Sequence, residues 1–241
     1  TLCVLGVLSA LSANNRLPRV GRVVLTVLTL ILFFALAVHA FPYFSNTLFI
    51  DGVQVKENST PFRLTWNFDK SLAGIVVLGT AVGITTLGLG VVRVLGYTLG
   101  IFAVTASVVM GLTYALSIIS FEPPTTEWFS FVLVFAPAQI LSTCLAEEVF
   151  FRGVIQRRLS QYFESKYYSR FIHLVPIAIA SVLFGLVHTG GGWIFVLIAA
   201  TAGFGYGYAY YKTGRIEAAI MVHFLLNLTH YTFFTYPIQI T

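Results

Sequence analysis

The sequence predicts an all-α bundle of transmembrane helices. Hydrophobic residues make up 57% of the 241 positions and charged residues only 10%, whereas a soluble domain carries roughly 25% charged residues. The mean hydropathy is +0.86, and long apolar runs recur along the chain, as expected of helices that need about 20 residues to cross a bilayer. Together these observations exclude a soluble globule and an intrinsically disordered chain.

Eight apolar segments satisfy or approach this length, and we expect each of them to be a helix. They are Thr1–Ala13, Val23–Phe44, Ser71–Val92, Leu95–Ser120, Phe129–Leu159, Phe171–His188, Trp193–Tyr211 and Ile216–Phe234. Because the chain begins with a Thr, we expect the first segment to be the end of a longer helix. The fifth exceeds one bilayer crossing, so we expect it to tilt or to leave the hydrocarbon. The prediction is a single multi-pass membrane domain over residues 1–241.

The loops between these segments differ in charge. Those on one side of the predicted bundle carry 11 of the 14 Lys and Arg residues, and those on the other side carry three. The positive-inside rule places the Arg-rich loops in the cytoplasm, so both ends of the chain would face outward. Short loops without appended domains favour a prokaryotic cell membrane, and no Lys/Arg run indicates a nucleic-acid partner. We expect the outer loop Asp51–Lys70 to be a strand-like hairpin or an interfacial segment.

Few ionisable residues fall inside the apolar segments. They are His39, Glu147, Glu148, Arg152, His173, His188, Glu217, His223 and His230. Such groups are costly in hydrocarbon and commonly mark functional sites. Of the five histidines, His39, His173 and His230 lie near segment ends without a spaced partner, so we expect them to make structural hydrogen bonds.

Two adjacent glutamates carry the largest free-energy cost of burial in a membrane that the sequence shows. Glu148 and Arg152 lie four residues apart, so they meet on one helix face, with the carboxylate in the favourable N-terminal position. Glu147 points about 100° away and has no cation at that spacing. We therefore expect Glu147 to be unpaired and available as a general base. The alternative is that both glutamates serve only in structural pairing.

Two further pairs have the same helical spacing. Phe184 and His188 are four residues apart, and so are His223 and Asn227. An imidazole and an amide held on one helix face suit the stabilisation of a developing oxyanion in a dry pocket. The alternative for either histidine is an ordinary hydrogen bond between helices.

Small residues and a buried thiol favour structural interpretations. Gly79/Gly83 and Gly203/Gly207 have the small-xxx-small spacing that lets helices approach closely. Cys144 lies one turn before Glu148, but nothing in the sequence activates it as a nucleophile, so we expect a free structural thiol.

Three motifs follow one another in the second half of the chain. Residues 147–152 read EExxxR, residues 184–188 read FxxxH and residues 223–227 read HxxxN. Their order, spacing and helical context resemble the CAAX prenyl protease and bacteriocin-processing (CPBP, or Abi) family of intramembrane endopeptidases. The resemblance covers about Phe129–Phe234, so residues 129–234 would be the catalytic core. Residues 1–128 would contribute spans whose role the sequence does not assign.

The resemblance implies a role for each motif residue. Glu147 would activate a water molecule together with His188. His223 and Asn227 would hold the oxyanion of the tetrahedral intermediate. Glu148 and Arg152 would form a supporting ion pair, and Phe184 would be a further supporting residue.

The resemblance also implies a substrate and leaves one cofactor question open. The family is described both as metalloproteases and as enzymes with a metal-free glutamate mechanism. If a divalent metal such as zinc binds, its ligands would be Glu147, His188 and His223. The sequence has no HExxH helix, and we favour a water activated without an obligatory metal. The expected substrate is a peptide or a prenylated C-terminal tail of CAAX type, met at the bilayer.

Two other classes of function remain open at this point. A proton- or ion-coupled transporter would also place carboxylates and histidines in the membrane, although the sequence shows neither an inverted repeat nor paired broken helices. A catalytically silent membrane scaffold or immunity protein could use the same fold to bind partners.

Overall fold

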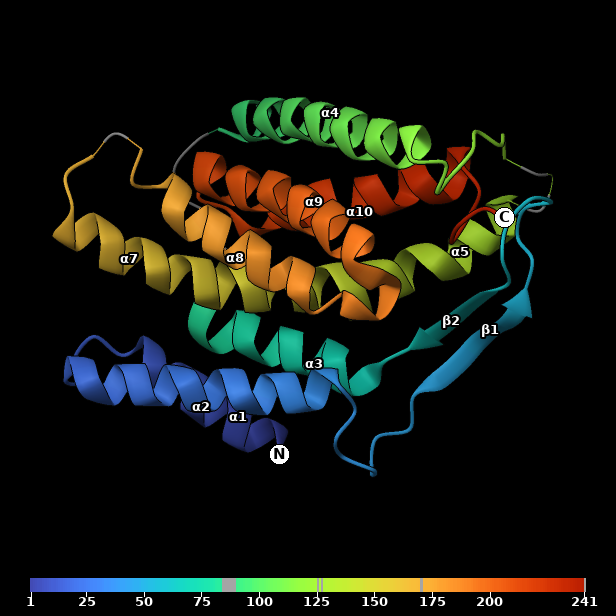
Figure 1. The fold of residues 1–241 in the computed structure, drawn as a ribbon. Coiled ribbons are helices and arrows are strands. Elements are labelled where there is room, and N and C mark those ends of the chain that lie inside the picture. The colour runs from blue at the N-terminus through green and yellow to red at the C-terminus, as the bar shows by residue number, and fades with distance from the viewer. Residues whose placement is uncertain (84–89, 125, 127, 170, 241) are drawn as a thin grey trace.

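A computed structural model describes residues 1–83, 90–124, 126, 128–169 and 171–240, and it confirms the all-α bundle (Figure 1). The α-helices are α1 (Leu2–Ala13), α2 (Arg19–Ala37), α3 (Phe68–Val77), α4 (Val91–Ala115), α5 (Trp128–Ala138), α6 (Ala146–Glu148), α7 (Arg157–Lys166), α8 (Leu174–Leu186), α9 (Gly192–Thr213) and α10 (Ile216–Phe233). Three π-helical segments, η1 (Leu78–Val82), η2 (Gln139–Leu145) and η3 (Val149–Gln156), and one 3₁₀ turn, η4 (Thr189–Gly191), connect some of them.

Four helical stretches among the described residues are long and apolar enough to cross a membrane. They are Arg19–Ala37, Val91–Ala115, the continuous helix Trp128–Lys166 and Thr189–Thr213. Helices α1 and α8 are apolar but shorter, and α10 contains Glu217 and two histidines that lower its hydropathy. The span expected over Ser71–Val92 lies partly outside the described residues. The chain is an integral membrane protein on this evidence, with fewer long apolar helices than the eight segments suggested.

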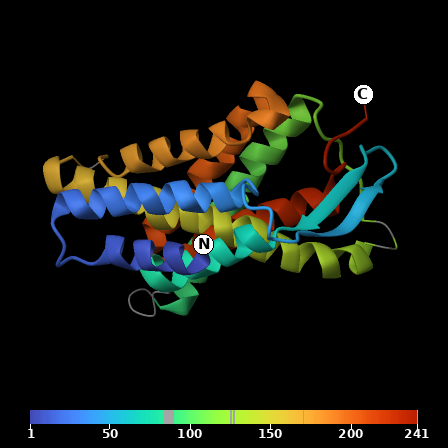
Figure 2. The same cartoon turned by 90° about the horizontal axis from the view of Figure 1, so that it is seen from below.

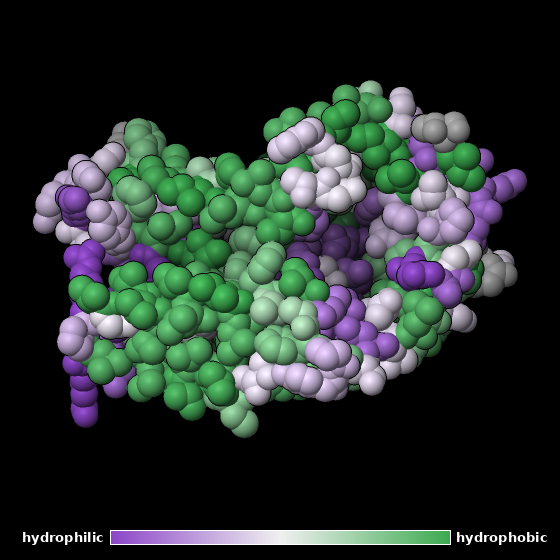
Figure 3. Space-filling model, turned by 60° about the horizontal axis from the view of Figure 1, so that its bottom comes forward, coloured by the Kyte–Doolittle hydropathy of each residue, from purple (hydrophilic) through white to green (hydrophobic). Residues whose placement is uncertain are grey.

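Apolar side chains cover much of the bundle's outside, as lipid contact requires. Val92 is 86% exposed and Val20 76% exposed, values that would be unfavourable on a water-facing surface. On the face shown in Figure 3, hydrophobic residues form a broad band with hydrophilic residues on either side of it. The same face is hollowed, and hydrophilic residues lie at the back of the hollow.

The hairpin predicted within Asp51–Lys70 is present, although its first strand begins earlier, at Thr47. Strands β1 (Thr47–Val53) and β2 (Phe62–Trp66) pair in antiparallel fashion, and the hairpin extends from the end of the bundle opposite α7 (Figures 1 and 2). Lys56 lies in the turn and is 4% exposed. Its ammonium donates to the carbonyl oxygens of Glu122, Pro123 and Thr232 at 2.8, 2.8 and 2.9 Å. These bonds fasten the hairpin to the end of α10.

The long central helix changes its winding around the two glutamates. Pro137 lies inside α5 and has no N–H to donate to the preceding turn. The helix continues as the π-helical η2, returns briefly to α-helix in α6, and becomes π-helical again in η3. Glu147 and Glu148 lie in α6, between the two π segments. Such π turns within helices are frequent at functional sites.

The ends of two predicted helices are wrong. The segment expected over Val23–Phe44 begins at Arg19 and ends at Ala37. The segment expected over Phe171–His188 begins at Leu174 and ends at Leu186, so His188 lies in the turn that follows it. Gly192 has φ of +84°, a backbone conformation that favours glycine. This turn separates α8 from α9 and explains why the apolar run does not continue as one helix.

Candidate active site

A buried charge cluster lies where the central helix meets α9 and α10. Arg152 Nη1 donates to Glu148 Oε1 at 3.0 Å, and both side chains have no exposed surface. The ion pair predicted from the four-residue spacing is therefore present. His223 Nδ1 contacts the same Glu148 oxygen at 2.8 Å, so the carboxylate joins two helices. This second partner comes from 75 residues away and was not predicted.

Close helix packing completes the surroundings of Arg152. Its Nη2 donates to the carbonyl oxygen of Gly203 at 2.7 Å, and one turn later Gln156 Nε2 donates to the carbonyl oxygen of Gly207 at 2.9 Å. A Cβ at Gly203 would lie 3.0 Å from Arg152 Nη2. The small-xxx-small interpretation is confirmed for this pair. For Gly79/Gly83 no such approach is present among the described residues, where a Cβ at either would meet nothing within 4 Å.

Aromatic rings orient the buried cluster. The Tyr206 ring stacks on the His223 ring with centroids 4.4 Å apart and an interplanar angle of 12°. The guanidinium carbon of Arg152 lies 4.7 Å from the centre of the Phe184 ring, a cation–π geometry. Phe184 also contacts the His188 ring, with centroids 4.7 Å apart. Phe184 therefore lies between the buried charges and His188.

A cavity of about 630 Å³ opens beside this cluster, and Glu147 and His188 both line it. Its walls come from α2, the central helix and the end of α8. Most of the lining is apolar, with Phe33, Phe150 and Leu183 among its members. The two residues expected to activate water thus share one cavity.

Glu147 is paired, contrary to the sequence-based expectation. Lys70 Nζ donates to Glu147 Oε1 at 2.7 Å, and the two side chains are 16% and 13% exposed. The expectation was wrong because it considered only cations at helical spacing, and Lys70 is 77 residues away on α3. The other carboxylate oxygen, Oε2, is buried without a hydrogen-bond partner among the described residues. That oxygen is free to accept a proton.

His188 is held by the helix end that precedes it. Its Nδ1 lies 2.7 Å from the carbonyl oxygen of Phe184. A carbonyl oxygen can only accept, so Nδ1 carries the proton of this hydrogen bond and Nε2 is the second ring nitrogen available to a ligand. Because His188 follows α8 rather than lying within it, the side chain reaches the cavity from the turn.

His223 and Asn227 lie one turn apart on α10, as their spacing predicts, and each has a partner on the central helix. Asn227 Nδ2 donates to Gln139 Oε1 at 3.0 Å, while His223 contacts Glu148. Neither is among the residues that line the cavity of Glu147. Asn227 retains a second N–H and His223 a second ring nitrogen. Gln139 and Lys70 are the polar residues of this region that the motifs do not identify.

The remaining histidines have structural partners. His39 lies 2.7 Å from Asp69 at the start of α3, and the His173 ring stacks on Tyr211 with centroids 4.2 Å apart. His230 Nε2 bonds the carbonyl oxygen of Thr235 at 3.1 Å. Cys144 is a free, buried thiol.

The geometry does not assemble a metal site. Within the described part of the chain, no group of three or more His, Cys, Asp or Glu side chains is gathered so that it could hold a metal ion. The ligand set considered from the sequence, Glu147, His188 and His223, stays a prediction. We derive no chemical step through a metal.

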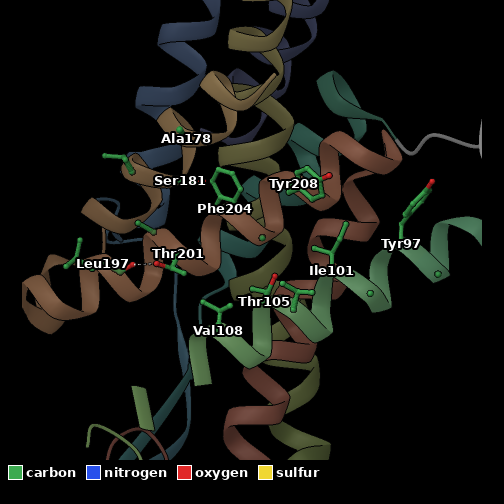
Figure 4. A pocket seen from close by; sticks show the side chains of 16 residues that line it. Tyr97, Ile101, Thr105, Val108, Ala178, Ser181, Leu197, Thr201, Phe204 and Tyr208 are labelled. Carbon is green, nitrogen blue, oxygen red and sulfur yellow. Dashed lines mark hydrogen bonds between the residues drawn. The ribbon is translucent and has the colours of Figure 1, made fainter. Parts of the chain in front are cut away.

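A second, larger cavity lies on the other side of α8 (Figure 4). It encloses about 790 Å³ between α4, α8 and α9. Figure 4 shows Tyr97 and Tyr208 toward one end and Val108 and Leu197 toward the other. No His, Asp, Glu, Lys or Arg is found among the described residues that line it. It therefore lacks the acid and base groups that hydrolysis requires, and the smaller cavity is the candidate active site.

Comparison with known proteins finds one family similar to the second half of the chain. Residues 128–229 match the sequence model of a family described as Rce1-like, the type II CAAX prenyl endopeptidases. No curated protein and no solved structure matches the chain. The matched segment runs from the start of α5 into α10 and contains all three motifs. The match confirms the resemblance that the motifs indicated: this segment is similar to the Rce1-like type II CAAX prenyl endopeptidases.

Proposed function

We propose that this protein is an intramembrane endopeptidase in which Glu147 and His188 activate the attacking water. The match of residues 128–229 to the Rce1-like family supports a CAAX-type endopeptidase in general. The observation that carries the assignment of residues is that Glu147, on the central helix, and His188, in the turn after α8, line one mainly apolar cavity. A carboxylate and an imidazole in such a site can share a water molecule between them.

The proposed reaction begins with proton transfer to Glu147. Oε2 takes a proton from the water, whose oxygen forms a bond to the scissile carbonyl carbon. The carbonyl oxygen then carries the negative charge of the tetrahedral intermediate. When the carbon–nitrogen bond breaks, the proton held by Glu147 passes to the departing amine, which leaves the carboxylate ready for another cycle.

His188 would orient the water in this scheme. Its Nδ1 proton is engaged by the Phe184 carbonyl oxygen, so in the neutral ring Nε2 has a lone pair that accepts a hydrogen bond from the water. The hydrogen bond to the helix end fixes the ring, which reduces the orientational freedom lost during the reaction.

His223 and Asn227 are the proposed oxyanion donors. Asn227 has one N–H left after its bond to Gln139. His223 already uses Nδ1 for Glu148, so donation from Nε2 requires a proton on both ring nitrogens. In this arrangement the buried Glu148–Arg152 pair supports the reaction through His223. Removal of one such donor typically slows a reaction by about 10²–10³-fold.

The proposed substrate is a peptide or a prenylated C-terminal tail that reaches the cavity from the bilayer. Aromatic and aliphatic residues form most of the cavity wall, which suits apolar side chains or a lipid chain more than a charged peptide. We further propose that the Arg-rich end faces the cytoplasm of a prokaryotic cell, as the positive-inside rule predicts.

Cleavage of a prenylated CAAX peptide in detergent tests this function. Wild type should cleave it, and Glu147→Gln should lower the rate by about 10²–10⁴-fold, the usual contribution of a general base. Glu164→Gln on the exposed surface of α7 is the matched control and should retain full activity. Equal rates for wild type and Glu147→Gln would show that Glu147 is not the base.

A further inference from the structure

Helix α3 lies outside the segment that matches the family, yet it reaches the candidate active site. It lies between α2 and the long central helix (Figure 1) and packs against η2 and α6. Lys70, in its first turn, is the one Lys or Arg among the described residues that line the cavity of Glu147. The cation that faces Glu147 therefore comes from the N-terminal half of the chain.

Two contacts fix the register of α3 against the central helix. A Cβ at Gly74 would lie 2.9 Å from the Cα of Ala146, so the absence of a side chain permits this close approach. Ser71 Oγ lies 2.8 Å from Ser142 Oγ. Lys70, Ser71 and Gly74 thus all face one short stretch of the central helix. Because α3 packs closely against Ala146, the residue before Glu147, the Lys70 side chain lies within hydrogen-bond distance of the Glu147 carboxylate.

The start of α3 is also held from the opposite side. Asp69 is 1% exposed and lies 2.7 Å from His39, at the end of α2. The backbone N–H of Lys70 donates to Asp69 Oδ1 at 2.8 Å. These bonds order the first turn, so the lysine side chain extends from a fixed base rather than from a free loop.

We propose that Lys70 is a positioning residue for hydrolysis by Glu147, an inference that rests on the proposed function. Its ammonium holds Oε1 and compensates the carboxylate charge in a mainly apolar cavity, where an unpaired charge would be costly. The other oxygen, Oε2, has no hydrogen-bond partner among the described residues. The ion pair thereby occupies Oε1 and leaves Oε2, a buried oxygen without a bonded partner, as the oxygen that would take the proton.

The location of the pair favours this role over simple structural pairing. The Glu148–Arg152 pair has no exposed surface, whereas the Lys70 and Glu147 side chains are 16% and 13% exposed at the cavity wall. Among the described residues, the Lys70 ammonium has one hydrogen-bond acceptor, Glu147, whereas the Lys56 ammonium is shared among three backbone carbonyls. The contact thus orients a cavity-lining carboxylate more than it joins two helices.

Steady-state cleavage by substituted proteins tests the proposal. Lys70→Met should lower kcat by about 100-fold, the scale expected when a catalytic group is misplaced by about 1 Å, with KM within about threefold of wild type. Lys70→Arg should retain more activity than Lys70→Met, because a guanidinium can still bind a carboxylate. Lys166→Met, on the surface of α7, is the matched control and should behave as wild type.

Chemical rescue separates positioning from folding. Added ethylammonium should restore part of the activity of Lys70→Ala, because it can occupy the vacated space beside Glu147, and should leave Glu147→Gln inactive. Unchanged or higher kcat for Lys70→Met would overturn the proposal, as would loss of activity that neither Arg nor ethylammonium restores. If wild type cleaves, Glu147→Gln does not and Lys70→Met is normal, only the role of Lys70 fails. If wild type does not cleave, both proposals fail.

Discussion

Glu147 and Glu148 are neighbours in sequence with opposite surroundings. Glu147 lines an open cavity and pairs with Lys70 from α3. Glu148 has no exposed surface and binds both Arg152 and His223. The difference follows from helical geometry, which points consecutive side chains about 100° apart. The Glu147 carboxylate therefore faces the cavity, while the Glu148 carboxylate is buried among packed side chains.

The comparison shows that the negative charges of Glu147 and Glu148 are balanced in different ways within one membrane helix. Glu148 shares its charge with a guanidinium one turn away and an imidazole on α10, all shielded from solvent. Glu147 has a single cation at the cavity wall and an oxygen without a partner. The two partners of Glu148 suit a structural role. Glu147 keeps one carboxylate oxygen that can still accept a proton. The following substitutions test whether that division of roles holds.

The largest expected change in stability comes from the interior pair. Arg152→Met would leave Glu148 buried with only the imidazole as a partner, and breaking a buried ion pair typically costs about 3–5 kcal/mol. We expect a correspondingly lower free energy of unfolding, measured by denaturant titration in detergent. Lys70→Met, which removes the partly exposed cation, should cost clearly less. Equal losses for the two variants would remove the distinction between the interior pair and the cavity pair.

A smaller effect is expected where α9 approaches Arg152. Gly203→Ala would place a Cβ 3.0 Å from Arg152 Nη2 and 3.1 Å from a Phe184 ring carbon, and overpacking of this kind costs about 1–3 kcal/mol. Gly100→Ala on α4 is the matched control, since a Cβ there meets nothing within 4 Å. Denaturant titration of both should show destabilisation only for Gly203→Ala. Tolerance of both would mean that the α9 contact does not constrain the buried pair.

The smallest expected effect concerns the ring that stacks on His223. Tyr206→Leu keeps an apolar side chain of substantial size but removes the stacked ring, a contact worth about 0.5–1.5 kcal/mol beyond area burial. We expect a modest loss of stability and, because His223 becomes less well oriented, a lower kcat. Tyr208→Leu, whose ring lines the other cavity, is the control. A normal kcat for Tyr206→Leu would indicate that the stack does not orient His223 for the reaction.

The sequence predicted local features better than distant ones. The Glu148–Arg152 pair follows from a four-residue spacing, and the approach at Gly203 follows from small residues one turn apart. Lys70 could not be identified in this way, because its partner lies 77 residues later. The one available signal was a lysine directly before an apolar segment, together with a membrane carboxylate that lacked a local cation. His188 was misplaced for another reason: hydropathy does not reveal that α8 ends at Leu186.

The central claim is that Glu147 performs chemistry while Glu148 maintains structure. Parallel measurement of cleavage rate per folded molecule and of unfolding free energy for Glu147→Gln and Glu148→Gln tests it most directly. We predict that Glu147→Gln nearly abolishes cleavage with little loss of stability, and that Glu148→Gln mainly destabilises the protein. Retained cleavage by Glu147→Gln, or an unaltered unfolding free energy for Glu148→Gln, would contradict the account.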